Sequence, residues 1–333
     1  MKFIICSIIS FLFCKNVFAD NYFISAYKDS LPAHTVEKTA DTSSYNNLKR
    51  TSITDSFLYQ PFGQMKYDTS YSIGNIFKPY KKFTKNTTIE STTNLNIQQQ
   101  NVSYKTKAIF ATQYFLNNAS HGLFQFDVSV TQLNTKVETM GLQLQYNSQD
   151  SIQHDTTSTF AKPLFDIVGK SMQLTIDSNN IIQAIDSSET GKSISTVLSG
   201  LSVAGENFEI GNNFGLLLNK NTDSLQLSYT WYDSLKTPNN SYLTKYTVQN
   251  ILHDEIVLLV SGSISQSGTI WSDGHSFKTS FTGTQTGKII IAKNTRQIKS
   301  RNITYNLQGS VNFEGKEIPA TAMSKINETL NPF

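Results

Sequence analysis

Hydrophobic and polar residues alternate along most of the chain from about residue 86 onward, and this pattern predicts antiparallel β-strands. The clearest stretch is 124–131, which has an apolar residue at every second position. Such a strand buries one face and exposes the other to water. The polar pair Asn134-Thr135 is expected to turn the chain into a return strand that reaches Tyr146.

The same alternation returns after the middle of the chain. Residues 172–176 and 181–185 flank a polar turn at 177–180, which predicts a hairpin. Residues 225–231 also alternate cleanly, and further apolar stretches follow up to Phe313. Turn residues such as His253-Asp254 separate these stretches, so we expect an antiparallel meander.

Two segments break the alternation and predict helices. Residues 160–168 have a proline near the start, a glycine just past the end and apolar residues on one helical face. Residues 193–218 begin with apolar residues at helical spacing and carry a second apolar group after Gly205. This second segment is therefore expected to be helical or mixed.

Together these elements predict a mainly β fold. We expect one large, curved antiparallel sheet, an open or half barrel, with a few short helices packed on its concave face. A long sheet must cover its apolar face, and the two central segments have the apolar stripes to do so. Sheet and helices are expected to enclose an apolar cavity lined by Leu164, Phe165, Val168, Val197, Leu201 and Phe214.

The amino terminus reads as a signal peptide. A lysine at position 2 precedes an apolar run from Phe3 to Phe13, and small residues precede a cleavage site between Ala19 and Asp20. The run is shorter than the roughly 18 residues that cross a bilayer, so we do not expect a membrane-spanning protein. Residues 1–19 therefore predict export to the periplasm or cell envelope.

Both cysteines, Cys6 and Cys14, lie inside this removed segment. The mature chain is then free of thiols, which excludes disulfides, cysteine-ligated zinc and iron–sulfur clusters. Lipidation at Cys14 is an alternative, but bulky residues precede that cysteine where lipoprotein processing needs a small one. The sequence thus favours a soluble over a lipid-anchored protein.

The mature chain divides into residues 20–85, an irregular arm that contains aromatic residues, and residues 86–333, a single β-rich domain. Four lysines gather near the end of the arm, from Lys78 to Lys85. A solvated face explains them better than an anionic partner does. Removing Lys2 and Lys15 from the 28 basic residues leaves 26 against 25 acidic residues, a net charge of +1, so no nucleic-acid partner is expected.

No catalytic constellation emerges from the motifs. Gly200 to Gly205 surrounds Ser202 with one residue too many for a hydrolase elbow. The five histidines are scattered, without the spacing of zinc ligands. We therefore expect a non-enzymatic protein with no cofactor and no metal.

Two regions resemble a known family. Residues 160–186 form a helix, a Gly-Lys pair and a hairpin, and residues 282–296 followed by 307–311 and 315–319 form the ending. Both are similar to an uncharacterised family of exported β-rich Bacteroidota proteins of unknown function, many of them lipoproteins. The resemblance covers about residues 86–325. It implies an exported β-rich domain and supplies no activity or site residues.

Two hypotheses for the function remain open. The first is a periplasmic or envelope binding or carrier protein whose apolar cavity holds a hydrophobic small molecule or lipid, as in half-barrel lipoprotein carriers. The second is a secreted structural or interaction module that binds envelope proteins or glycans through exposed strands and the arm at 20–85. The aromatic residues Tyr229 and Trp231, which share one strand face, fit core packing, or a surface that stacks on sugars or contacts lipid.

Overall fold

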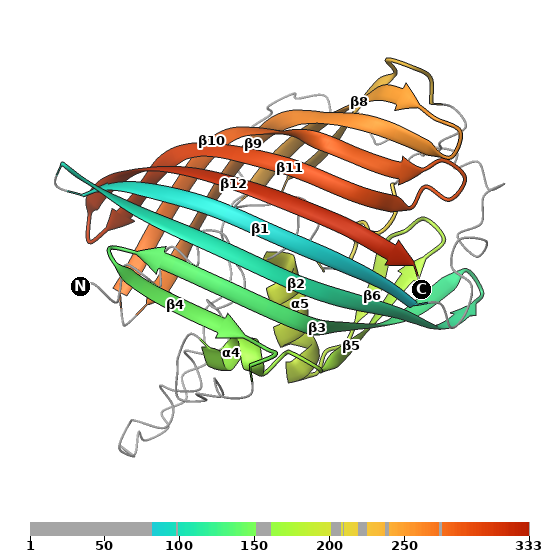
Figure 1. Cartoon of the computed structure of the whole chain (residues 1–333), viewed down its shortest axis with the longest axis horizontal. Helices are drawn as coiled ribbons and strands as arrows, with labels where there is room; N and C mark the ends of the chain where they lie inside the picture. The colour runs from blue at the N-terminus through green and yellow to red at the C-terminus, as the bar shows by residue number, and fades with distance from the viewer. Residues whose placement is uncertain are drawn as a thin grey trace, which may run out of the picture.

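The computed structural model describes residues 82–97, 99–150, 161–200, 208, 210–218, 225–236, 240–272 and 275–332. Twelve strands in these ranges join in one antiparallel sheet (Figure 1). The first six are β1 (Lys82–Ile97), β2 (Gln100–Ser120), β3 (Leu123–Thr139), β4 (Leu142–Asn147), β5 (Ser171–Asp177) and β6 (Ile182–Ile185). The others are β7 (Thr230–Lys236), β8 (Asn240–Ile251), β9 (Glu255–Ser272), β10 (His275–Ala292), β11 (Ile298–Phe313) and β12 (Lys316–Pro332).

This architecture confirms the expected fold class, because the sheet is single, antiparallel and open at two edges. Its strand order is β6-β5-β3-β2-β1-β12-β11-β10-β9-β8-β7, with β4 paired to β3. Two meanders thus meet where β1 pairs with β12 in the middle of the sheet. β1 starts at Lys82, four residues before the expected boundary of the β-rich domain. Residues 1–81, with the expected signal peptide and most of the arm, lie outside the described residues.

Strand β3 shows both a confirmed pattern and an error. Residues 124–130 alternate between buried and more exposed side chains, as predicted. The turn expected at Asn134-Thr135 is wrong, because β3 continues to Thr139. A β-bulge shifts its register against β2, so Thr131 and Gln132 are both exposed. In the sequence, this local break in the alternation resembles the end of a strand.

The true turn of this hairpin is Met140-Gly141. Both residues have positive φ, 46° and 79°, as in the tight turns that suit the twist of antiparallel strands. A Cβ added at Gly141 would meet nothing within 4 Å. Any cost of a side chain there is therefore the cost of the left-handed backbone alone.

Gly141→Ala is expected to lower the free energy of unfolding by about 1 kcal/mol, because an L-residue is strained in this conformation. Urea unfolding followed by circular dichroism measures the change. Gln143→Ala, on the exposed part of β4, is the control and should have a smaller effect. Equal effects of the two variants would show that the backbone at the turn is not strained.

Later strands follow the expected meander with one correction. The hairpin of β5 and β6 and the turn at His253-Asp254 are confirmed. Residues 225–229, however, precede the strand: β7 begins only at Thr230, and the side chain of Leu227 is 64% exposed. Ser228 has a φ of 65°, so a turn interrupts the alternation that suggested a longer strand.

One face of the sheet bears the buried strand side chains, and we call it the inner face. Two described helices pack on this face, because their buried residues belong to the same core cluster as those strand residues. α4 (Ala161–Phe165) is shorter than expected, because Val168 already forms a bridge with Val130 of β3. α5 (Glu189–Gly200) begins before the predicted segment at 193–218. Its start is capped by Ser188, whose Oγ accepts a hydrogen bond from the Gly191 N–H at 3.0 Å.

Residues 210–218 are not helical and form what we call the strap. Asn213 bridges Ile181 beside β6, and Leu217 bridges Gln297 beside β11. In a flat sheet the six strand spacings from β6 to β11 would cover about 29 Å. The chain from Asn213 to Leu217 reaches at most about 14 Å, to which the two bridges add about 10 Å. The sheet must therefore curve around the strap.

The apolar side chains of the inner face form two clusters. The main core contains residues of most strands together with Ile194 and Leu198 of α5 and Phe214 of the strap. The second cluster consists of Leu95, Tyr104, Phe277, Phe281, Val311 and Ala320. These six residues come from the five neighbouring strands β2, β1, β12, β11 and β10, in a sheet that Figure 1 shows to be curled.

Two inner-face glycines permit this curl. A Cβ on Gly283 of β10 would lie 1.9 Å from the backbone oxygen of Asn306, and one on Gly309 of β11 would lie 1.9 Å from that of Ser280. Neighbouring strands approach too closely at both points for any side chain. Glycine is the residue that allows such a close approach and a sharp bend in a strand.

Candidate functional site

The six residues expected to line a cavity have different positions. Leu164 and Phe214 are buried in the main core, and Val168 packs against it partly buried. Phe165, by contrast, is 40% exposed and does not face the core. Leu201 and the side chain of Val197 lie outside the described residues. Leu164, Val168 and Phe214 thus all contribute to the main core, and their role in ligand binding stays a prediction.

Phe214 anchors the strap to the sheet. Its ring lies 5.6 Å from the ring of Tyr114 in an edge-on contact and 5.2 Å from that of Phe126. The Asn180 side-chain amide donates a hydrogen bond to the backbone oxygen of Phe214 at 2.9 Å. The space beside it measures about 10 Å³, which is room for roughly one water molecule. The strap end of the inner face is therefore well packed.

Three charged residues are buried on the inner face beside the strap. Lys85 Nζ lies 3.2 Å from Glu328 Oε1, and Arg301 Nη1 donates to Glu328 Oε2 at 2.9 Å. Burial alone would raise the pKa of Glu328, but the positive charges of Lys85 and Arg301 and their hydrogen bonds lower this pKa below its ordinary value. Glu328 is therefore held as a carboxylate between two cations on β1 and β11.

The prediction of a solvated lysine cluster is wrong for Lys85, because this residue is 6% exposed. The alternation of buried and exposed side chains along β1 explains the burial of Lys85. Lys85 stands two residues from Phe83 and four from Ile89, and all three share the buried face. Glu328 was not predicted as a buried residue. It lies between Ile326 and Leu330 on the buried face of β12, so the same alternation explains its burial.

Buried hydroxyl groups line the same face. Among the described residues, five threonine hydroxyls are buried and have no hydrogen-bond partner. They belong to Thr87, Thr93, Thr106, Thr112 and Thr139. Threonine can both donate and accept a hydrogen bond, and a buried hydroxyl without a partner costs free energy. The inner face is therefore apolar with polar groups that lack a protein partner.

Two of these hydroxyls flank the second cluster. Thr93 on β1 and Thr139 on β3 are both directly opposite Tyr104 of β2. Thr93 is 1% exposed and Thr139 is 6% exposed. This row combines an aromatic side chain with two hydroxyls, beside the apolar side chains of the second cluster.

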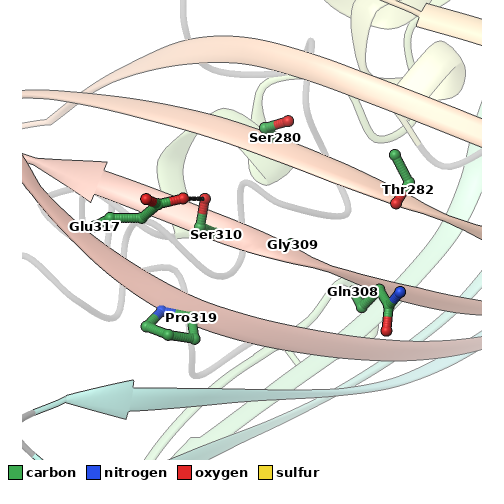
Figure 2. Close-up of a pocket in the computed structure, with 7 residues that line it drawn as sticks. All are labelled: Ser280, Thr282, Gln308, Gly309, Ser310, Glu317 and Pro319. Carbon is green, nitrogen blue, oxygen red and sulfur yellow. Dashed lines mark hydrogen bonds between the residues drawn. The ribbon is translucent and has the colours of Figure 1, made fainter.

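The opposite, outer face of the sheet has a polar hollow over β10, β11 and β12. Figure 2 shows its lining side chains on three neighbouring strands, and its volume is about 410 Å³. Ser310 donates a hydrogen bond to Glu317 Oε1 at 2.6 Å. The lining residues are Ser280, Thr282, Gln308, Gly309, Ser310, Glu317 and Pro319.

A second hollow of about 620 Å³ overlaps the first and extends it across β1 and β2. It shares Thr282, Gln308, Gly309 and Pro319 with the first hollow. It adds Asn94, Asn96, Asn101, Ala320 and Thr321. We call the combined feature the outer groove. Eight of its twelve described lining residues have a side-chain amide or hydroxyl.

The described residues contain no group of three or more histidine, cysteine, aspartate or glutamate side chains that could hold a metal ion. His253 and Asp254 form a contact of 2.7 Å at an exposed turn. In the part of the chain that the structure describes, no helix combines the length and the hydropathy needed to cross a membrane.

No protein-family model matches the chain, and no curated protein matches it. A structure of lipid–protein interactions in lipovitellin is similar with a TM-score of 0.44 and 15% identity. The alignment covers 77% of this chain and 25% of that one, so the chain spans about a quarter of the lipovitellin chain.

Two channel structures are more distantly similar. OccK2 (OpdF) of Pseudomonas aeruginosa has a TM-score of 0.23 and 6% identity over 76% of this chain and 99% of that chain. An outer membrane channel from Pseudomonas putida F1 has a TM-score of 0.18 and 8% identity over 77% and 97% of the two chains. Similarity at these levels is not evidence for a shared function. The resemblance to exported Bacteroidota proteins stays a prediction.

Proposed function

We propose that this protein is a non-enzymatic binding or carrier protein of the cell envelope. Its ligand is an amphiphile, a molecule with a hydrophobic body and a hydrogen-bonding group, and it binds on the inner face of the curved sheet. The export signal expected in residues 1–19 supports the envelope location. The second cluster, with its flanking hydroxyls, is the observation that carries the proposal.

The position of the second cluster supports an apolar ligand. Phe214 and the helix residues Ile194 and Leu198 belong to the main core, whereas the described members of the second cluster all come from strands of the sheet. Aromatic and aliphatic side chains gathered on a concave surface are the usual lining of a small-molecule site. The region around the second cluster is therefore the part of the inner face best suited to a hydrophobic body.

The hydroxyls of Thr93 and Thr139 support a polar group on that ligand. Each is buried and without a protein partner in the described part of the chain. A ligand with a hydrogen-bonding atom on each side of Tyr104 would satisfy both groups. A purely aliphatic ligand would leave them unsatisfied, at a cost of about 1 to 3 kcal/mol each.

Binding of cis-parinaric acid, a fluorescent fatty acid, tests the proposal directly. Leu307 faces inward between the two clusters, and its neighbour Asn306 faces outward and is exposed. Leu307→Trp should fill the site and weaken probe binding at least roughly tenfold, whereas Asn306→Trp should leave it unchanged. Thermal melts confirm that both variants fold. Probe binding that is absent from the wild type, or equal in both variants, contradicts the proposal.

Removing the two hydroxyls should have opposite effects on stability and on binding. The double substitution Thr93→Val with Thr139→Val should raise the free energy of unfolding of ligand-free protein by about 1 kcal/mol or more, because it removes unsatisfied buried groups. It should also weaken the binding of a fatty acid. Thr92→Val, on the outer face of β1, is the control. A double variant that binds the probe as tightly as the wild type would exclude these hydroxyls from the site.

A further inference from the structure

We infer that the outer groove is a binding site for an uncharged oligosaccharide. The groove lies on the face of the sheet opposite the proposed amphiphile site, so neither proposal depends on the other. Its ligand class follows from the chemistry of the lining, from its charge and from its shape.

The lining residues form continuous rows across neighbouring strands. Asn94 of β1 is opposite Thr321 of β12, which in turn is opposite Gln308 of β11. Gln308 is opposite Thr282 of β10. Every residue of this row ends in an amide or a hydroxyl, and each of these side chains can both donate and accept hydrogen bonds.

Such groups match the hydroxyls of a sugar. A sugar hydroxyl also donates and accepts, so an amide can bond two neighbouring hydroxyls at once. Asn96 is opposite Asn101 of β2, and Pro319 of β12 lines the same hollow. The ring of Pro319 offers a small apolar surface among the polar groups. A sugar ring likewise combines polar edges with apolar faces.

The charge of the groove favours an uncharged ligand. Among the described residues that line it, Glu317 is the one that carries a charge, and its Oε1 already accepts a hydrogen bond from Ser310. Outside the lining, the neighbouring pair of Asn306 on β11 and Thr284 on β10 is uncharged as well. A phosphate or other anion would find no cation in this lining, whereas anion sites in proteins use arginine or lysine.

The shape of the groove favours an extended ligand. The groove crosses five strands from β10 to β2, and four interstrand spacings amount to about 19 Å. The backbone groups of β10 to β2 are used in the strand ladders, so a ligand on this face must bind side chains. A peptide that adds a strand needs a free sheet edge, which favours an oligosaccharide over a peptide here.

A panel of immobilised uncharged hexasaccharides of glucose, mannose, galactose and N-acetylglucosamine tests this inference on the full mature chain. Sulfated and uronic-acid oligosaccharides and unmodified peptides form the comparison sets. At least one uncharged sugar should bind, and its affinity should change little between about 50 and 500 mM salt, because no ion pair is involved. Binding only to charged sugars, only to peptides, or to nothing on the panel overturns the inference.

Variants then locate the site by titration calorimetry with the sugar that binds. Gln308→Ala should weaken binding by roughly tenfold, as expected for the loss of a well-placed hydrogen bond. Asn306→Ala removes an amide from the same face of the same strand, two residues away and outside the lining, and should leave the affinity unchanged. Equal affinities of wild type and Gln308→Ala would place the sugar elsewhere and overturn the inference. Thermal melts confirm that both variants fold.

Discussion

Glu328→Gln is expected to lower the free energy of unfolding by about 3 to 5 kcal/mol, because it leaves two buried cations without their anion. Glu328 is 4% exposed and lies within 3.2 Å of Lys85 and 2.9 Å of Arg301. The glutamine keeps the shape of the side chain, so the loss reports charge rather than packing. Urea unfolding at neutral pH measures it.

A matched control comes from an exposed ion pair on the same sheet. Lys299 Nζ lies 2.7 Å from Glu255 Oε1, but the two side chains are 43% and 34% exposed. Glu255→Gln should therefore change the stability by less than about 1 kcal/mol. Replacing all three buried charges, by Lys85→Met, Arg301→Met and Glu328→Leu together, should restore much of the loss. Equal effects of the two Glu→Gln variants would show that the cluster is not buried in solution.

The same cluster predicts an acid-sensitive contribution to stability. The pKa of Glu328 is lower in the folded protein than its ordinary value, so folding favours the ionised carboxylate. Its contribution is complete above the unfolded pKa of about 4.3 and is lost as the pH falls through the lower folded pKa. The stability difference between wild type and Glu328→Gln should thus be constant near neutral pH and shrink only in acid.

Gly283→Ala is expected to lower the free energy of unfolding by about 3 kcal/mol, near the upper end for overpacking a well-packed site. The added Cβ would lie 1.9 Å from the Asn306 backbone oxygen, and a backbone atom cannot move aside as the end of a side chain can. Strands β10 and β11 would have to separate and lose part of the curl at the second cluster. Denaturant unfolding measures the loss.

Thr284→Ala is the control for this prediction. It changes the next residue of β10, which faces outward and is exposed, and should alter the stability by less than about 1 kcal/mol. If Gly283→Ala were as stable as this control, the strands would not approach each other closely at Gly283. The curvature of the sheet would then have another cause.

The strand content and the open antiparallel sheet could be predicted because alternation is a local signal. The errors arose where local signals conflict with pairing. The β-bulge near Thr131 looked like a turn, and the turn at Ser228 looked like part of a strand, because neither register nor φ is visible in a hydrophobic pattern. The strap could not be predicted either, since its bridges to Ile181 and Gln297 join segments remote in sequence.

The buried charges and the outer groove illustrate a second limit. Lys85 and Glu328 occupy alternate positions that face the core, as their apolar neighbours on the same strands do. Lysine and glutamate are so seldom buried, however, that their residue types argue against this position. The pairing of β1 with β12 brings them together across more than 240 residues. The groove likewise joins residues of β1, β2, β10, β11 and β12, and their asparagines and threonines are indistinguishable in sequence from the other polar residues of the outer face.

Native mass spectrometry of the protein purified from its own host, without detergent exchange, tests the central claim most directly. We expect the folded protein to carry an additional discrete mass that organic solvent extracts and that Leu307→Trp reduces, while Asn306→Trp retains it. The extracted molecule should contain both an apolar body and a hydrogen-bonding group. A folded protein that shows only the mass of its polypeptide, and that binds no added fatty acid, would contradict a ligand on the inner face.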